Sequence, residues 1–106
     1  MDARIKTMLL ELRSELQALY GERLVRLVLF GSHARGDAAS GSDVDVLVVL
    51  RGPVQPGKEI ERTGQLLADL SLRHGEVVSC LFMDAQRFSH RNGPLLRNVR
   101  REGVVL

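Results

Sequence analysis

Apolar residues recur near the N-terminus at the spacing of an α-helix. Charged and polar residues fill the positions between them, so one face is apolar and the other is not. The apolar positions are Ile5, Met8, Leu9, Leu12, Leu16 and Leu19. Gly21 follows this stripe, and glycine is the residue type that most often ends a helix. The pattern therefore predicts an amphipathic helix that ends near Gly21.

Two aliphatic runs predict β-strands at residues 24–30 and 44–50. The first run is interrupted only by Arg26, and the second is nearly all aliphatic, as in a central strand buried on both faces. Residues 31–41 lie between them and are rich in Gly, Ser, Ala and Asp, which predicts a loop with room for one helical turn. Residues 51–57 hold two prolines and two glycines and predict a second loop.

Residues 58–74 predict a second helix, and Gly75 follows as its cap. Residues 77–83 then form an apolar run that predicts a third strand. The expected buried stripe of the helix consists of Ile60, Leu66, Leu67 and Leu70. A buried stripe here would place the helix against the sheet that the strands form.

The C-terminal part predicts two short helices and an edge strand. Asp84 can cap a helix that reaches Phe88, and Pro94 suits the first turn of a last helix that Gly103 ends. Residues 104–106 predict a short edge strand. This order of elements predicts an α/β (α+β) fold, a small mixed β-sheet backed by helices. The 106 residues show no repeat and no internal boundary, so we expect one domain over residues 1–106.

Composition limits the classes of function. The formal net charge is only +2, which gives no reason to expect a nucleic-acid partner. The apolar runs are too short to span a membrane, and the N-terminus lacks the apolar core of a signal peptide. We therefore expect a cytoplasmic protein.

Arginines gather in the C-terminal third, where no acidic residue stands between Asp84 and Glu102. This segment could face RNA, and its apolar residues could equally dock a partner protein. The only aromatic residues nearby are Phe82 and Phe88, so support for base stacking is thin. We prefer an ordinary solvated face here.

Asp43 and Asp45 are the first candidates for chemistry. Alternate side chains of a strand share a face, so these two carboxylates point the same way at the start of an apolar strand. Unpaired, they would repel each other and lose solvation. A divalent cation removes both costs, and oxygen ligands favour Mg²⁺ or Mn²⁺ over Zn²⁺. The alternative is that the aspartates only end the preceding turn.

Gly31 and Ser32 directly follow the first predicted strand. Glycine lets a ligand approach the backbone, and the N–H groups of a turn that opens a helix attract anions. The hydroxyl of Ser32 can donate to a phosphate oxygen, and Arg35 can pair with phosphate charge. A plain glycine turn is the alternative for Gly-Ser alone. Beside a carboxylate pair, the loop indicates a site for a metal-bound triphosphate.

The motif Gly-Ser-x-Ala-Arg-Gly at 31–36, followed by Ser-Asp-x-Asp at 42–45, resembles the signature of the minimal nucleotidyltransferases. These belong to the DNA polymerase beta-like nucleotidyltransferase superfamily. The resemblance implies the polymerase beta-like fold, with Gly31 and Ser32 holding the triphosphate of ATP. It implies that Asp43 and Asp45 hold Mg²⁺ or Mn²⁺, while Arg35 and Gly36 complete the loop.

One feature departs from the family pattern. The full superfamily site has a third carboxylate on a later strand, often the general base. The best pairing with that motif places Ser79 where the acid should be, and Glu76 lies an odd number of residues away, on the other face of a regular strand. Glu76 could still reach the site through a bulge or a different register. Glu76 is therefore the candidate third catalytic residue, and Ser79 at the acid's position is the alternative.

The resemblance implies transfer of a nucleoside monophosphate, AMP from ATP, to a hydroxyl of a partner. It also implies a role as the antitoxin of a toxin–antitoxin pair whose partner is a small helical HEPN protein. The alternative is a weak or inactive nucleotide-binding module that neutralises such a partner by capping it. A third hypothesis is a small RNA-binding protein that uses the C-terminal arginines.

Overall fold

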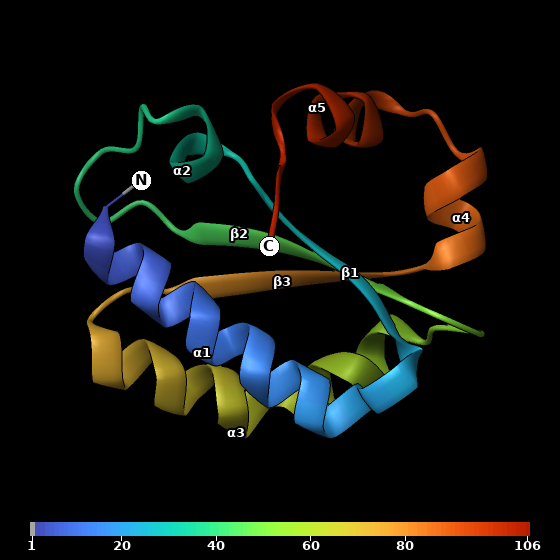
Figure 1. Cartoon of the computed structure of the whole chain (residues 1–106), viewed down its shortest axis with the longest axis horizontal. Coiled ribbons are helices and arrows are strands. Elements are labelled where there is room, and N and C mark those ends of the chain that lie inside the picture. The colour runs from blue at the N-terminus through green and yellow to red at the C-terminus, as the bar shows by residue number, and fades with distance from the viewer. Residues whose placement is uncertain (1) are drawn as a thin grey trace.

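The computed structural model describes residues 2–106 and has the mixed α/β architecture that the sequence predicts (Figure 1). Three strands and both long helices lie where the periodicity places them. The elements in chain order are α1 (Ala3–Tyr20), η1 (Gly21–Arg23), β1 (Leu24–Phe30), α2 (Ser32–Arg35), β2 (Val44–Leu50), α3 (Pro56–His74), β3 (Val78–Asp84), α4 (Ala85–His90), α5 (Pro94–Glu102) and β4 (Val104–Val105).

The four strands form one mixed sheet in the order β3-β2-β1-β4. β1 runs antiparallel to both β2 and β4, whereas β2 and β3 are parallel. The parallel pair is joined through α3, as such a crossover requires. β2 is therefore a central strand, and the predicted edge strand at the C-terminus is confirmed as β4 beside β1.

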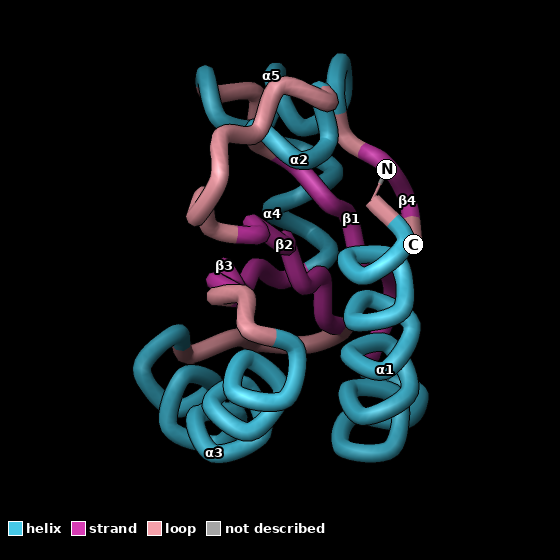
Figure 2. The backbone as a smooth tube through the Cα atoms, turned by 90° about the vertical axis from the view of Figure 1, so that its left-hand side faces the viewer, coloured by secondary structure: helices cyan, strands magenta, loops and turns pink. Residues whose placement is uncertain are grey.

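Helices cover the two faces of the sheet unequally. The long helices α1 and α3 pack together against one face, and the shorter α2, α4 and α5 lie on the other (Figures 1 and 2). Two apolar clusters, one on each face, share β2. Leu47 and Val49 pack toward α5, and the side chains that alternate with them pack toward α1 and α3. Burial on both faces explains the nearly unbroken aliphatic sequence of this strand.

The apolar stripe of α1 is confirmed except at its end. Met8, Leu12 and Leu16 are fully buried, but Leu19 is 41% exposed and Tyr20 is buried in its place. The Tyr20 ring packs near Phe82 of β3. The last core contact of α1 is therefore made by the ring of Tyr20, while the neighbouring Leu19 points to solvent.

The predicted stripe of α3 is wrong at Ile60, which is 59% exposed. Its neighbour Glu59 is only 4% exposed, and Thr63 is fully buried. The Tyr20 hydroxyl donates a hydrogen bond of 2.8 Å to Oε1 of Glu59, and Arg62 lies 3.7 Å from the same oxygen. These partners offset the cost of burying the carboxylate, so the helix turns a polar residue inward.

Two element boundaries also differ slightly from the prediction. α3 begins at Pro56, which suits a first helical turn, and β3 extends to Asp84. Asp84 caps α4 as predicted, because its carboxylate accepts a hydrogen bond from the Arg87 N–H. Within residues 2–106, no helix combines the length and apolar character that crossing a bilayer demands.

Candidate active site

Asp45 is the second residue of β2, and Asp43 immediately precedes the strand. Both stand at the edge of the sheet where β1 ends, because Phe30 is the register partner of Asp45. Asp45 is half-buried and Asp43 is exposed, and neither forms an ion pair with any group among residues 2–106. The structure thus places two carboxylates without a cationic partner on the α5-facing side of the sheet.

The electrostatics of Asp45 reflect this arrangement. Burial raises the pKa of its carboxyl above the ordinary value of 3.8, and the nearby charge of Asp43 raises it further. His33 acts in the opposite direction and lowers it. A second positive charge, such as a divalent cation, would favour the ionised form of both aspartates.

Gly31 joins β1 to α2 at the point closest to Asp45. Its backbone has φ +77° and ψ −158°, a conformation open to glycine but strained for other residues. A Cβ atom at this position would lie 2.5 Å from Oδ2 of Asp45. Position 31 therefore requires glycine for two reasons: the backbone conformation is strained for other residues, and the Asp45 carboxylate leaves no space for a Cβ atom.

The four-residue helix α2 follows Gly31 and begins at Ser32. Its first N–H groups have no intrahelical acceptor, so they remain able to donate to an anion. Gly36 ends the helix with φ +83°, and the N–H groups of Gly36 and Asp37 both donate to the Ser32 carbonyl oxygen. This closes a compact turn that fixes Ser32 directly after Gly31, the residue that lies against Asp45.

His33 contacts the segment before Asp43, which the sequence did not predict. Its Nε2 lies 3.1 Å from the carbonyl oxygen of Ser42, the residue before Asp43. The imidazole therefore ties α2 to the segment that carries the first aspartate. Only the fold brings positions 33 and 42 together, so no local pattern could have shown this contact.

Arg35 is held by carboxylates. Its Nε lies 3.1 Å from Oδ2 of Asp37, and its Nη1 lies 3.4 Å from Oε2 of Glu102 at the end of α5. The hydrogen bond to Asp37 is the main cause of the raised pKa of the guanidinium. The carboxylates of Asp37 and Glu102 occupy two N–H donor groups of Arg35, so the guanidinium would have to leave these partners to pair with a phosphate.

The structure separates the two candidates for the third acid. Asp45 pairs with Ser79 across the parallel strands, and paired residues project from the same face of a sheet. Val78 is buried against α1 and α3 on the opposite face, and Glu76 stands two residues before it. Oε1 of Glu76 lies 3.9 Å from Nη2 of Arg4 on α1. Ser79, and not Glu76, is thus the β3 residue placed beside Asp45.

Oxygen donors suitable for Mg²⁺ are present as a pair. Within residues 2–106, no three side chains of the His, Cys, Asp and Glu types converge on a common metal position. Two carboxylates on one strand fit a hard cation that completes its coordination with phosphate oxygens and water. The residues present therefore fit a magnesium–nucleotide complex better than a metal held by protein alone.

A cavity of about 410 Å³ lies beside this corner of the fold. One wall is the loop after α2, with Gly36 and Gly41, and the other is formed by the start of α1 and Glu76. His33 lines the cavity as well. Neither the two aspartates nor Gly31 and Ser32 line this cavity, so it adjoins the loop after α2 and not the carboxylate pair itself.

Comparison with known proteins agrees with this geometry. The nucleotidyltransferase domain family matches residues 9–93. A protein of Methanocaldococcus jannaschii named "putative protein adenylyltransferase" is 34% identical, and the match covers 91% of each chain. A second protein of this name from the same organism is 32% identical over 65% of this chain and 69% of its own.

Two solved structures share the fold. One, described as a "putative minimal nucleotidyltransferase", matches with a TM-score of 0.63 and 27% identity, over 100% of this chain and 97% of its own. The other, a toxin–antitoxin structure with AMP-PNP, has a TM-score of 0.61 and 18% identity, over 88% of this chain and 68% of its own. The motif at 31–45, the sheet topology and these matches agree, and the chain belongs to the nucleotidyltransferase domain family as a minimal nucleotidyltransferase.

Proposed function

We propose that this protein transfers AMP from ATP to a hydroxyl group of a partner protein and releases pyrophosphate, with Mg²⁺ or Mn²⁺ held by Asp43 and Asp45. The observation that carries the proposal is the contact between Gly31 and the Asp45 carboxylate. It brings the free N–H groups at the start of α2 next to Asp45, and neither Asp45 nor Asp43 forms an ion pair among residues 2–106. A triphosphate held by the loop would therefore lie at the metal-binding side chains.

Each residue has a distinct task in this proposal. Gly31 leaves room for the phosphates, Ser32 donates its hydroxyl and N–H to phosphate oxygens, and the two aspartates bind the cation. The cation, when bound, neutralises phosphate charge and aligns the reacting phosphoryl group. Arg35 binds a phosphate of the nucleotide only if its ion pair with Asp37 or with Glu102 breaks.

A protein acceptor is favoured by the relatives. The Methanocaldococcus jannaschii proteins carry the name of protein adenylyltransferases, and the fold is shared with the toxin–antitoxin structure. We propose that this chain acts as the antitoxin of such a pair and that its partner is a small helical HEPN protein. The acceptor would then be a side-chain hydroxyl of that partner.

A second candidate function is nucleotide binding with little or no transfer, in which the chain neutralises its partner by capping it. The register of Asp45 with Ser79 favours this candidate, because a hydroxyl stands where the superfamily places a third carboxylate. Phosphoryl transfer relies mainly on positioning and electrostatics, so two aspartates without a base permit slow transfer. The two candidates share the nucleotide site and differ only in turnover.

The test is incorporation of label from α-³²P-ATP into the protein encoded beside this chain, with both proteins purified. We expect Mg²⁺-dependent labelling of the partner by the parent and none by an Asp43→Asn/Asp45→Asn variant. If the parent binds ATP and inhibits the partner without labelling it, the capping function is correct. Failure of the parent to bind ATP in the presence of Mg²⁺ would refute both candidates.

A further inference from the structure

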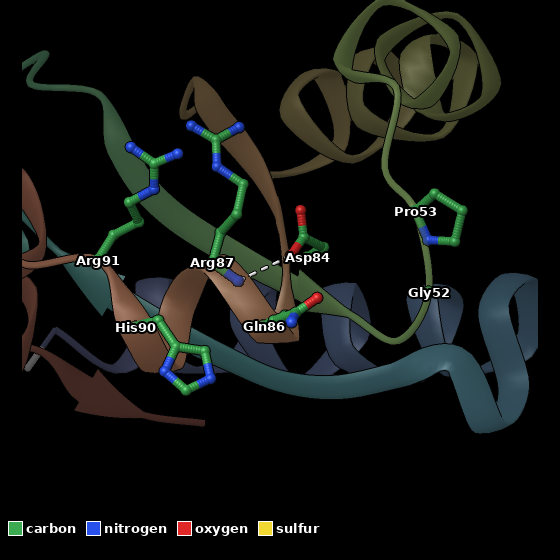
Figure 3. Close-up of a pocket in the computed structure, with 7 residues that line it drawn as sticks. All are labelled: Gly52, Pro53, Asp84, Gln86, Arg87, His90 and Arg91. Carbon is green, nitrogen blue, oxygen red and sulfur yellow. Dashed lines mark hydrogen bonds between the residues drawn. The ribbon is translucent and has the colours of Figure 1, made fainter.

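A second cavity lies away from the aspartates. It is a hollow of about 690 Å³, open to solvent, and it is lined by α4, by Asp84 at the end of β3, and by Gly52 and Pro53 in the loop after β2 (Figure 3). Leu50 pairs with Asp84, so the cavity stands at the carboxyl ends of the parallel strands β2 and β3. This is the edge at which open α/β sheets commonly bind ligands. Asp45 stands at the other end of β2, about 20 Å away at the usual rise per residue.

Two arginines dominate the charge of this cavity. Arg87 and Arg91 are four residues apart, and Figure 3 shows both guanidinium groups extending to the same side of α4. Neither forms an ion pair within residues 2–106. Asp84 is the one carboxylate that lines the cavity, and its Oδ1 already accepts a hydrogen bond of 2.7 Å from the Arg87 N–H. Two neighbouring cations thus remain without an anion.

Further positive charge stands behind the helix. The guanidinium groups of Arg26 and Arg100 lie 5.9 Å and 5.5 Å from the centre of the Phe88 ring. Arg100 also donates to the backbone carbonyl oxygens of Phe88 and Arg91, which holds α4 in place. Four arginines therefore stand at or behind this cavity, although the whole chain has a formal net charge of only +2.

The opposite wall is also held by specific bonds. Arg23 donates to the carbonyl oxygens of Arg51 and Pro53, at 3.1 Å in each case. The loop that faces the two arginines is thereby fixed to the start of β1. A cavity with two anchored walls is prepared for a ligand rather than created by loose loops.

We propose that this cavity binds phosphate groups through Arg87 and Arg91. Guanidinium groups pair with phosphate oxygens in a bidentate manner, and two of them match the charge of a phosphate monoester or of two successive phosphodiesters. The ligand is either a small phosphate compound or the backbone of a single-stranded RNA. The site is separate from the nucleotide site at Asp43 and Asp45, and it does not depend on the transfer reaction.

The test uses two probes in EDTA without nucleotide: a fluorescent single-stranded RNA oligonucleotide, followed by anisotropy, and inorganic pyrophosphate, followed by calorimetry. The proteins are the parent, the Asp43→Asn/Asp45→Asn variant, and Arg87→Ala/Arg91→Ala. A Lys58→Ala/Arg13→Ala variant removes two exposed cations from α3 and α1 and serves as the charge-matched control. Thermal unfolding checks that each variant is folded.

We expect the Arg87→Ala/Arg91→Ala variant to bind at least tenfold more weakly than the parent. The aspartate variant and the control should bind like the parent. If RNA is the ligand, the salt dependence of its binding should become shallower in the arginine variant by about 1.4 units of slope, because two phosphate contacts are lost. If the parent binds pyrophosphate but not the RNA, the ligand is a small phosphate compound. If the parent binds the RNA and pyrophosphate displaces it, the ligand is a nucleic-acid backbone. The proposal fails if neither probe binds the parent at low salt, or if the arginine variant loses no more affinity than the control.

Discussion

Asp45 and Ser79 are register partners on the parallel strands β2 and β3, and their side chains project from the same face of the sheet. Val44 and Val78, one residue earlier on each strand, are also partners and are buried on the opposite face. Glu76 precedes the first residue of β3, and its carboxylate lies 3.9 Å from Nη2 of Arg4 on α1 and not beside Asp45. The identity of residue 79 therefore decides how many carboxylates the site can have.

A Ser79→Asp substitution should strengthen metal-dependent ATP binding and increase AMP transfer. The new carboxylate would stand beside Asp45 and add a third oxygen ligand on the same face. A general base typically contributes about 10²–10⁴-fold, so an increase in transfer would be easy to measure. Ser79→Asn is the matched control, since it adds similar volume without charge. Equal behaviour of the two variants would contradict the assignment of position 79.

A Glu76→Gln substitution should leave both ATP affinity and AMP transfer unchanged. Its carboxylate pairs with Arg4, whose side chain is 73% exposed, so we expect a loss of stability below about 1 kcal/mol. Calorimetric ATP titration and the labelling assay are the two measurements. A selective loss of transfer with intact ATP binding would show that Glu76 reaches the site after all and acts as the third acid.

Replacing both aspartates with asparagine should abolish Mg²⁺-dependent ATP binding without unfolding the protein. Neither side chain has an ion-pair partner to lose among residues 2–106, and their mutual repulsion disappears. The apparent melting temperature without metal should stay the same or rise. Calorimetry that finds unchanged ATP affinity would refute the metal site.

The raised pKa of Asp45 makes a prediction about pH. The carboxyl of Asp45 keeps its proton to a higher pH in the folded state than in the unfolded state, where its pKa is near the ordinary value of 3.8. The stability that this protonated carboxyl contributes is therefore present below pH 3.8 and is lost as pH rises through the folded pKa. The Asp45→Asn variant lacks this loss. Its unfolding free energy, measured in EDTA relative to the parent, should therefore increase as pH rises from about 3 to about 7. A relative stability that decreases with pH would contradict the origin of the shift.

A Gly31→Ala substitution should destabilise the protein and weaken ATP binding together. The backbone conformation at this position costs about 1–3 kcal/mol for a residue with a Cβ, and the added atom would displace the Asp45 carboxylate. Gly36→Ala is the control, because φ there is also positive but no atom lies within 4 Å of the added Cβ. We expect Gly36→Ala to lose some stability and to keep its ATP affinity when folded. Equal losses of affinity in the two variants would argue against a special role of Gly31.

Much of the fold could be predicted from the sequence, because helix and strand periods differ and β2 is aliphatic on both faces. The errors arose where a tertiary contact outweighed the pattern. The inward position of Glu59, and with it the exposure of Ile60, depends on the hydroxyl of Tyr20 at the end of another helix. No pattern within α3 contains that information.

Only those features of the candidate site that depend on residues close together in the sequence could be predicted. The shared face of Asp43 and Asp45 follows from strand geometry, and the family motif indicated the role of Gly31. The bond of His33 to Ser42 and the ion pair of Arg35 with Glu102 join positions that are distant in sequence. Such contacts depend on how α2, α5 and the loop before β2 pack, which one sequence does not show.

The position of Ser79 on an exposed strand has a consequence for how such proteins can change. The two aspartates stand at the head of the most buried strand, whereas residue 79 lies on the outermost strand and its side chain is exposed. A single replacement there would alter the number of carboxylates without disturbing the apolar core. If the proposed site is correct, turnover and folding stability are encoded at separate places, and a lineage with this fold could gain or lose catalysis while keeping its shape.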